Sequence, residues 1–206
     1  MTIRDFAKNI YERLLYRRLR VLCRRELPKI IIGAHVRPGL LLDNGWISTS
    51  QKSLDMLKEE NWQNLFGNRR IGALLAEHVW EHLTPEDGLR AAEMCFAHLA
   101  PGGWLRVAVP DGLHPGSEYI QKVRPGGSGA GSDDHKVLYT YVELSNLFGQ
   151  VGFQVDLLEY FDSNGTFHKK EWSSKEGHIH RSSLNDIRNV HDELVYTSII
   201  LDARKP

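Results

Sequence analysis

Short apolar runs alternate with amphipathic stretches along most of this sequence. Short runs rich in β-branched residues predict buried strands, whereas apolar residues that recur at the helical period predict helices. Helices are expected over residues 1–28, 53–66, 84–99 and 137–151. Strands are expected over residues 29–33, 45–50, 71–79, 104–109, 154–161 and 195–204.

The helix over residues 84–99 has the clearest boundary signals. Thr84 is a preferred N-cap residue, and Pro85 follows it at the first helical position. Pro101-Gly102-Gly103 then stops the helix. Two long stretches have no predicted element: the glycine-rich residues 112–135, which predict a mobile lid, and the polar residues 162–194.

Strands that alternate with helices predict an α/β domain. The expected fold is a Rossmann-like, doubly wound, mostly parallel sheet with helices on both faces. The last two strands, 154–161 and 195–204, favour an antiparallel C-terminal strand. In such sheets ligands bind outside the carboxyl ends of the strands, near the point where the strand order reverses. Those ends fall at Gly33–His35, Ser50, Glu77–His78 and Asp111.

Positive charge is concentrated at the N-terminus. Residues 1–29 hold nine lysines and arginines against three acidic residues, although the net charge of the whole chain is zero. This segment predicts a basic amphipathic helix over 1–28, ahead of a main domain over 29–206. Such a helix either packs its apolar stripe on the domain or binds a membrane surface weakly. The stripe consists of Ile3, Phe6, Ile10, Leu14 and Leu22.

Composition narrows the class of protein. A chain of 206 residues with 26 basic and 26 acidic side chains has no net field that would attract nucleic acid. No apolar run approaches the roughly 20 residues that span a bilayer, and no secretory signal is expected. Cys23 and Cys95 predict free thiols in a reducing compartment, and hence a cytoplasmic protein.

The stretch Ala76–Leu83 reads AEHVWEHL and contains the spacing H-x-x-E-H. In zinc enzymes this spacing on a helix lets two histidines share one metal. His78 lies at the end of a predicted strand, however, so only about one turn of helix is available after it. We therefore predict no metal here. A metal-dependent enzyme that uses His78, Glu81 and His82 is kept as an alternative.

Several stretches resemble class I S-adenosylmethionine-dependent methyltransferases. KIIIGAH, GWISTS and EHVWEHLTPEDGLRAAEMCFAHLAPGGWLRVAVPDG are similar, in this order, to a bacterial group of predicted methyltransferases. Sequences of that group typically read P-G-W-I-N-x-D, then EHVLEHL, then LKPGGxLRIAVPD. EYFDSNGTFH, HRSSLNDIRN and YTSIILDARKP also resemble the group, so the resemblance covers residues 29–206.

The resemblance implies transfer of a methyl group from S-adenosylmethionine to a small or medium-sized acceptor. It places the cofactor on Gly33, Ala34, His35, Ser50, Glu77 and His78. If the acceptor needs a base, the candidate catalytic residues are His78, Asp111 and His114, with His135 nearby. The chain departs from the pattern in two places, because the glycine turn has a single glycine and Ser50 replaces an acid. These departures favour a second hypothesis, a degenerate methyltransferase fold that binds a ligand or partner without catalysis.

Overall fold

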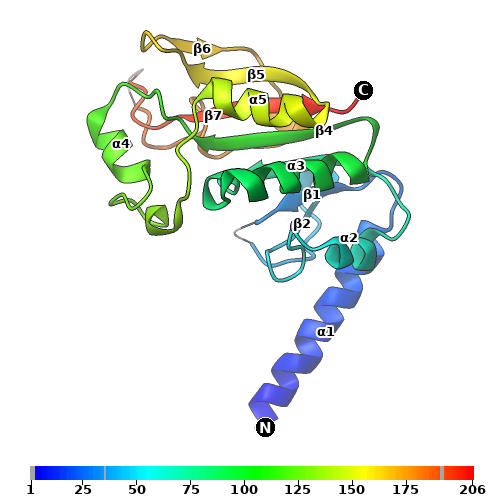
Figure 1. Cartoon of the computed structure of the whole chain (residues 1–206). Coiled ribbons are helices and arrows are strands. Elements are labelled where there is room, and N and C mark those ends of the chain that lie inside the picture. The colour runs from blue at the N-terminus through cyan, green and yellow to red at the C-terminus, as the bar shows by residue number, and fades with distance from the viewer. Residues whose placement is uncertain (1–2, 35, 191–192) are drawn as a thin grey trace.

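The computed structural model describes residues 3–34, 36–190 and 193–206, with side chains from residue 10 onward. A seven-stranded sheet runs through the chain in the order β2-β1-β3-β4-β7-β5-β6 (Figure 1). Its strands are β1 (Lys29–Ile32), β2 (Trp46–Ser48), β3 (Ile71–Glu77), β4 (Leu99–Pro110), β5 (Gln154–Phe161), β6 (Phe167–Lys169) and β7 (Ser198–Arg204). The helices are α1 (Ile3–Cys23), α2 (Glu59–Phe66), α3 (Pro85–His98), α4 (Ser117–Val123) and α5 (Tyr141–Val151).

The strand pairing confirms the predicted sheet. β1 pairs in parallel with β2 on one side and with β3 on the other, and β3 pairs in parallel with β4. β7 runs antiparallel between β4 and β5, and β6 is antiparallel to β5 at the edge. β1 to β5 therefore share one direction, as expected for a Rossmann-like, mostly parallel sheet with an antiparallel C-terminal strand. The strand order reverses between β1 and β3, which makes their carboxyl ends the switch point.

The two faces of the sheet are covered differently. On one face, α2, α3, α5 and the end of α1 enclose the main core, in which Trp62, Cys95 and Phe148 are fully buried. On the other face, Trp172 and Ile179 pack over side chains of the central strands. Within the described residues no α-helix contributes to that second cluster. The segment that covers this cluster is largely irregular and includes the 3₁₀ turn Ser174–Glu176.

A buried arginine holds this irregular segment on the sheet. Arg106 of β4 is only 1% exposed and lies opposite Asp202 of β7. Its guanidinium donates to both carboxylate oxygens of Asp202, at 2.8 and 2.9 Å. It also donates to the carbonyl oxygens of Ser173 and Gly177, at 3.0 and 2.9 Å. The segment is thereby fixed by charge-assisted bonds from the sheet rather than by a helix.

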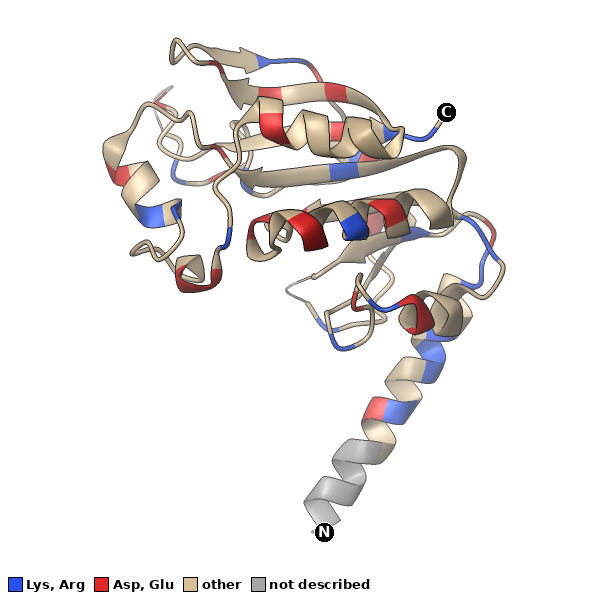
Figure 2. Cartoon of the chain, in the orientation of Figure 1, with Lys and Arg blue, Asp and Glu red and all other residues tan. Residues whose placement is uncertain are grey.

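The N-terminal helix ends at Cys23 rather than at Pro28, and its apolar residues divide between two faces. Leu19 and Leu22 are buried against the domain, whereas Leu14 and Val21 are 57% and 70% exposed. The predicted stripe is therefore only partly packed, and its first members, Ile3 and Phe6, lie outside the described side chains. α1 extends away from the sheet (Figure 2), and its described side chains include four arginines, Arg13, Arg17, Arg18 and Arg20. Among the described helices none is both long and apolar enough to cross a membrane.

Other differences from the predicted elements are local. α2 and α5 each begin several residues later than expected, and β4 begins at Leu99, so that it includes Pro101-Gly102-Gly103. The pairing of β3 with β4 shifts register there, which accommodates the glycines. α4 and β6 were not predicted, because both are short and lie in polar, glycine-rich surroundings. The free thiols of Cys23 and Cys95 are both buried, as expected of unpaired cysteines.

Candidate functional site

The carboxyl ends of the first four strands meet at one edge of the sheet. The register of β1 against β3 pairs Ile32 with Ala76, and Gly33 and Glu77 each follow directly on this pair. The Ala34 N–H donates to the Thr49 carbonyl oxygen at 2.8 Å, which ties the end of β1 to the end of β2. The His78 N–H donates to a carbonyl oxygen of β4 at 2.8 Å, which ties the end of β3 to that strand. Predicted cofactor residues of separate strands are thus brought together.

The turn after β1 requires glycine for two reasons. Gly33 has φ +66°, in the left-handed region that side chains with a Cβ rarely adopt. A Cβ at this position would also lie 3.0 Å from the Val79 side chain. The segment after β3 is therefore packed directly on the glycine turn. His35, the last residue predicted for this turn, lies outside the described residues.

At the end of β2 the chain has a serine turn in place of a carboxylate. The Ser50 N–H donates to Ser53 Oγ at 2.9 Å, and the Ser53 hydroxyl donates back to the Ser50 carbonyl oxygen at 3.0 Å. Ser50 opens onto a hollow of about 880 Å³ between this turn and α1. Its wall combines apolar or aromatic side chains with four cationic ones and a single acid: Tyr11, Leu15, Tyr16, Leu19, Pro38, Arg13, Arg17, Arg20, Lys52 and Glu12, together with Ser50 and Ser53.

Glu77 is tied to the segment that covers the second face. Its carboxylate accepts the Arg181 N–H at 2.7 Å and lies 2.9 Å from Nδ1 of His180. Burial raises the pKa of Glu77, but the hydrogen bonds from His180 and Arg181 outweigh burial, so the pKa lies below its usual value. Glu77 thus remains ionised while it holds the loop across the strand ends.

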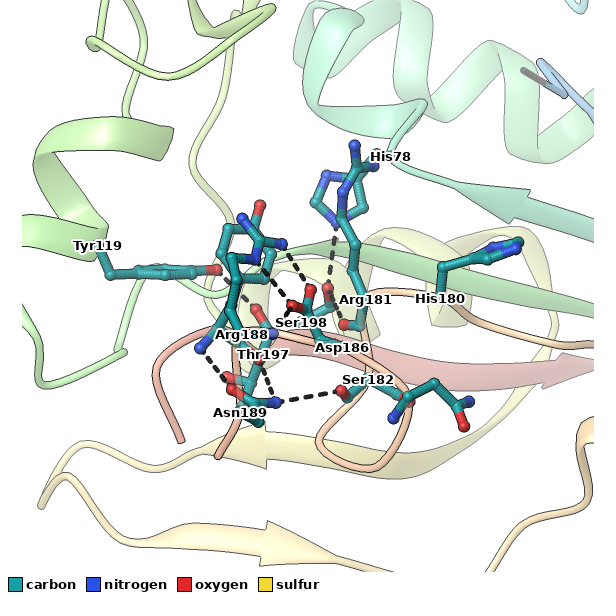
Figure 3. A network of polar contacts seen from close by, with 12 residues as sticks. His78, Tyr119, His180, Arg181, Ser182, Asp186, Arg188, Asn189, Thr197 and Ser198 are labelled. Carbon is teal, nitrogen blue, oxygen red and sulfur yellow. Dashed lines mark hydrogen bonds and ion pairs between the residues drawn. The ribbon is translucent and has the colours of Figure 1, made fainter. Parts of the chain in front are cut away.

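His78 lies at the upper edge of a polar network (Figure 3). It has φ +54°, which turns the chain sharply at the end of β3. Nε2 lies 3.1 Å from Ser198 Oγ, and the Ser198 hydroxyl donates to the Arg181 carbonyl oxygen at 2.8 Å. Nδ1 lies 2.9 Å from Glu81 Oε1, and the His78 side chain is 7% exposed. Of the predicted catalytic residues, His78 alone has ionisable or hydroxyl side chains on both ring nitrogens.

Contacts of Asn189 and Arg188, which the sequence did not reveal, complete this network. Nδ2 of Asn189 donates to the carbonyl oxygens of Ser182, Ser183 and Tyr196, at 3.3, 3.2 and 2.8 Å. The Arg188 guanidinium lies 3.5 Å from the centre of the Tyr196 ring. These contacts join the loop to the residues just before β7. No spacing in the sequence marks them, because each depends on how the loop folds back.

Asp111 is part of the framework at the end of β4. Its side chain is buried, and its carboxylate accepts the Leu113 N–H at 2.9 Å and the Phe161 N–H at 2.7 Å. Burial raises the pKa of Asp111 to about 6, although the two backbone bonds oppose the shift. Its carboxylate oxygens therefore already have partners, which fits a positioning role better than a catalytic one.

His114 is held in a similar way. Its Nδ1 accepts the Gly116 N–H at 3.0 Å, so Nε2 carries the proton that is donated to the Leu194 carbonyl oxygen at 3.1 Å. The ring stacks on Tyr119 with centroids 4.0 Å apart. Burial lowers the pKa of His114, although the bond to Leu194 opposes the shift, which keeps the ring neutral. Both ring nitrogens are engaged within the framework.

We expect the contribution of Asp111 to the unfolding free energy to fall as pH rises from about 4 to about 6. The folded-state pKa of about 6 exceeds the usual value of about 3.9, so the folded state binds the extra proton in this window. Relative to Asp111→Asn, the unaltered protein should lose on the order of 2 kcal/mol of unfolding free energy across it. Urea unfolding of both proteins at several pH values measures this difference. A difference that does not vary with pH would contradict the prediction.

The metal set His78, Glu81 and His82 is not assembled as the alternative hypothesis requires. His78 lies in the left-handed turn, and Glu81 and His82 follow on a single 3₁₀ turn, Trp80–His82, so no helix presents the two histidines together. Glu81 and His82 instead meet His135, which comes from the glycine-rich stretch 112–135.

No family model and no curated protein matches this chain, but solved structures do. A SAM-dependent methyltransferase from Archaeoglobus fulgidus is 13% identical, with 94% of each chain covered and a TM-score of 0.48. A possible histamine N-methyltransferase from Thermotoga maritima is 15% identical, with 96% of each chain covered and a TM-score of 0.46. A [4+2]-cyclase is 14% identical over 93% of this chain and 80% of its own, with a TM-score of 0.48. Similarity at this level does not identify a reaction.

Proposed function

We propose that the chain is an S-adenosylmethionine-dependent methyltransferase. The observation that carries this proposal is the position of the glycine turn. Gly33, which the sequence resemblance assigns to the cofactor, lies at the switch point of a sheet whose reversed β7 is inserted between β4 and β5. Ligands of open α/β sheets bind at this edge. The residues present fit the cofactor at the glycine turn, whereas Ser50 offers a weaker partner for ribose hydroxyls than a carboxylate would.

The bound cofactor would supply an activated methyl group on its sulfonium. An oxygen or nitrogen acceptor that receives this methyl group would have to lose its proton. We assign release of this proton to solvent and a positioning role to His78, because Glu81 and Ser198 engage both of its ring nitrogens and the Ser198 hydroxyl already donates to the Arg181 carbonyl oxygen. We assign positioning roles to Asp111 and His114.

The hollow beside Ser50 suggests where the acceptor binds. Because Ser50 belongs to both the cofactor edge and the hollow, an acceptor there would lie next to the cofactor. A volume of about 880 Å³ lies within the usual range for small-molecule sites. Four cationic side chains against one acid favour an acceptor with an anionic group and an apolar body.

Titration calorimetry with S-adenosylmethionine and S-adenosylhomocysteine tests the proposal. We expect both ligands to bind, and we expect S-adenosylhomocysteine at about a hundred times its dissociation constant to add about 2.7 kcal/mol to the unfolding free energy. No heat at millimolar ligand would contradict cofactor binding and support the degenerate, partner-binding hypothesis.

Replacing Ser50 by aspartate should tighten cofactor binding about tenfold. A carboxylate accepts both ribose hydroxyls with charge-assisted bonds that are roughly twice as strong as neutral ones. Gln51→Asp provides the matched control, because it adds the same single negative charge one residue away, in the same turn. If both variants tighten binding equally, general electrostatics and not a ribose contact is responsible.

A further inference from the structure

Three potential metal ligands converge just beyond the end of β3. Glu81 and His82 lie on the 3₁₀ turn after this strand, and His135 follows a second 3₁₀ turn, Ser132–Asp134. Two backbone N–H groups, of Lys136 and Val137, donate to the Glu81 carbonyl oxygen at 2.7 and 3.3 Å. These bonds bring His135 beside the other two, and ligand atoms of the three side chains lie within 4.8 Å of one another.

Buried polar atoms of Glu81 and His82 lack hydrogen-bond partners among the described residues. The Glu81 side chain is 1% exposed, and its Oε2 has no hydrogen-bond partner among the described residues. The nearest ionic neighbour of its Oε1 is Nδ1 of His78, at 2.9 Å. Nδ1 of His82 is buried and has no hydrogen-bond partner within the described part of the chain, and its ionic neighbour is Asp134 Oδ2, at 3.5 Å. A buried, incompletely compensated carboxylate is unfavourable, and a bound cation would remove the deficit.

A hydrogen bond fixes His135 in the tautomer that a metal-binding histidine needs. Nδ1 of His135 lies 2.7 Å from the Val123 carbonyl oxygen, which can only accept a proton. The hydrogen is therefore on Nδ1, and Nε2 carries the free lone pair. The His82 and His135 rings meet edge to face, with centroids 4.8 Å apart. Metal-binding histidines are commonly held in this way, by a backbone carbonyl on the nitrogen that does not bind the metal.

From this geometry we propose that Glu81, His82 and His135 form a binding site for one divalent transition-metal ion such as Zn²⁺. Two imidazoles and a carboxylate suit Zn²⁺, Fe²⁺ or Mn²⁺ better than Ca²⁺ or Mg²⁺, which prefer oxygen donors. Three protein donors leave coordination positions open for water or another ligand, as in catalytic rather than structural sites. The site does not depend on the proposed methyl transfer, because it is defined by donors outside the glycine turn and the Ser50 hollow.

Calorimetric titration of ZnCl₂ into the full-length, chelator-treated protein tests this site without any cofactor. We expect about one ion per chain, and we expect Glu81→Gln and His135→Ala each to weaken binding at least tenfold. The matched control is the double variant His178→Ala/His180→Ala. It removes two histidines whose rings are 4.6 Å apart elsewhere on the chain, and it should retain the ion.

Glu81→Gln also separates loss of metal binding from loss of folding. Glutamine has nearly the same shape and can still hydrogen-bond to Nδ1 of His78, so the metal-free variant should fold and melt close to the temperature of the metal-free parent. Zinc should raise the melting temperature of the parent and leave that of Glu81→Gln unchanged. No zinc binding by the parent would overturn the proposal. So would equal binding by a folded Glu81→Gln variant, or loss of the ion only when His178 and His180 are removed.

Discussion

Replacing Arg106 by methionine should lower the unfolding free energy by about 3–5 kcal/mol, because removing one partner of a buried ion pair leaves the other charge uncompensated. Asp202 is only 2% exposed, so its carboxylate would face the interior alone. The carbonyl oxygens of Ser173 and Gly177 would lose their donor as well. For a chain of this size the melting temperature should fall by roughly 10 °C. Urea and thermal unfolding both measure the effect.

Arg204→Met is the matched control for this experiment. Arg204 approaches the same Asp202 carboxylate, at 3.4 Å, but its side chain is 47% exposed. Exposed ion pairs contribute about 0–1 kcal/mol, so this variant should be nearly neutral. Losses of similar size in the two variants would show that burial of the Arg106 pair is not what holds the segment.

The double variant Arg106→Met/Asp202→Leu separates the charge from the carbonyl contacts. Replacing a whole buried pair by apolar residues is often neutral, so the double variant should recover much of the lost stability. Any remaining loss belongs to the carbonyl oxygens of Ser173 and Gly177, which neither apolar side chain can satisfy. A double variant that is less stable than Arg106→Met would argue against this division.

Arg106 also illustrates why the sequence predicts one face of the sheet and not the other. The helical face follows from local signals, such as the N-cap at Thr84, whose hydroxyl accepts the Asp87 N–H, and the strand Gln154–Phe161 was predicted with its observed bounds. The second face depends on Arg106 and Asp202, which are far apart in the chain and pair only once β4 and β7 are neighbours. A polar stretch with no periodicity cannot reveal that a buried guanidinium will order it.

The candidate site divides in the same way. Gly33, Ser50 and Glu77 could be placed at one edge from the strand pattern alone, because parallel strands end on the same side. The pairing of Glu81 with His135 could not be predicted, since it arises from backbone bonds between the turn after β3 and the end of a long glycine-rich loop. The engaged state of Asp111 and His114 was equally hidden, because their partners are backbone groups set by the tertiary fold.

Gly33→Ala should weaken cofactor binding about a hundredfold, which corresponds to about 2.7 kcal/mol of binding free energy. The added Cβ would lie 3.0 Å from the Val79 side chain and would displace the segment that carries Glu77 and His78. It would also strain the backbone at φ +66° in the turn that the cofactor must approach closely. Calorimetry with S-adenosylhomocysteine measures the change in affinity, and thermal unfolding without ligand measures the change in stability.

Gly67→Ala is the control for backbone strain at a glycine outside the proposed cofactor site. Gly67 has φ +59° and ψ −128° at the end of α2, a conformation that is nearly restricted to glycine, and nothing lies within 4 Å of an added Cβ there, so the substitution strains the backbone without crowding. Both variants should lose about 1–3 kcal/mol of stability in the absence of ligand. Only Gly33→Ala should lose affinity for the cofactor. If Gly33→Ala binds S-adenosylhomocysteine as tightly as Gly67→Ala does, the cofactor does not rest on the turn after β1, and the proposed position of the site is wrong.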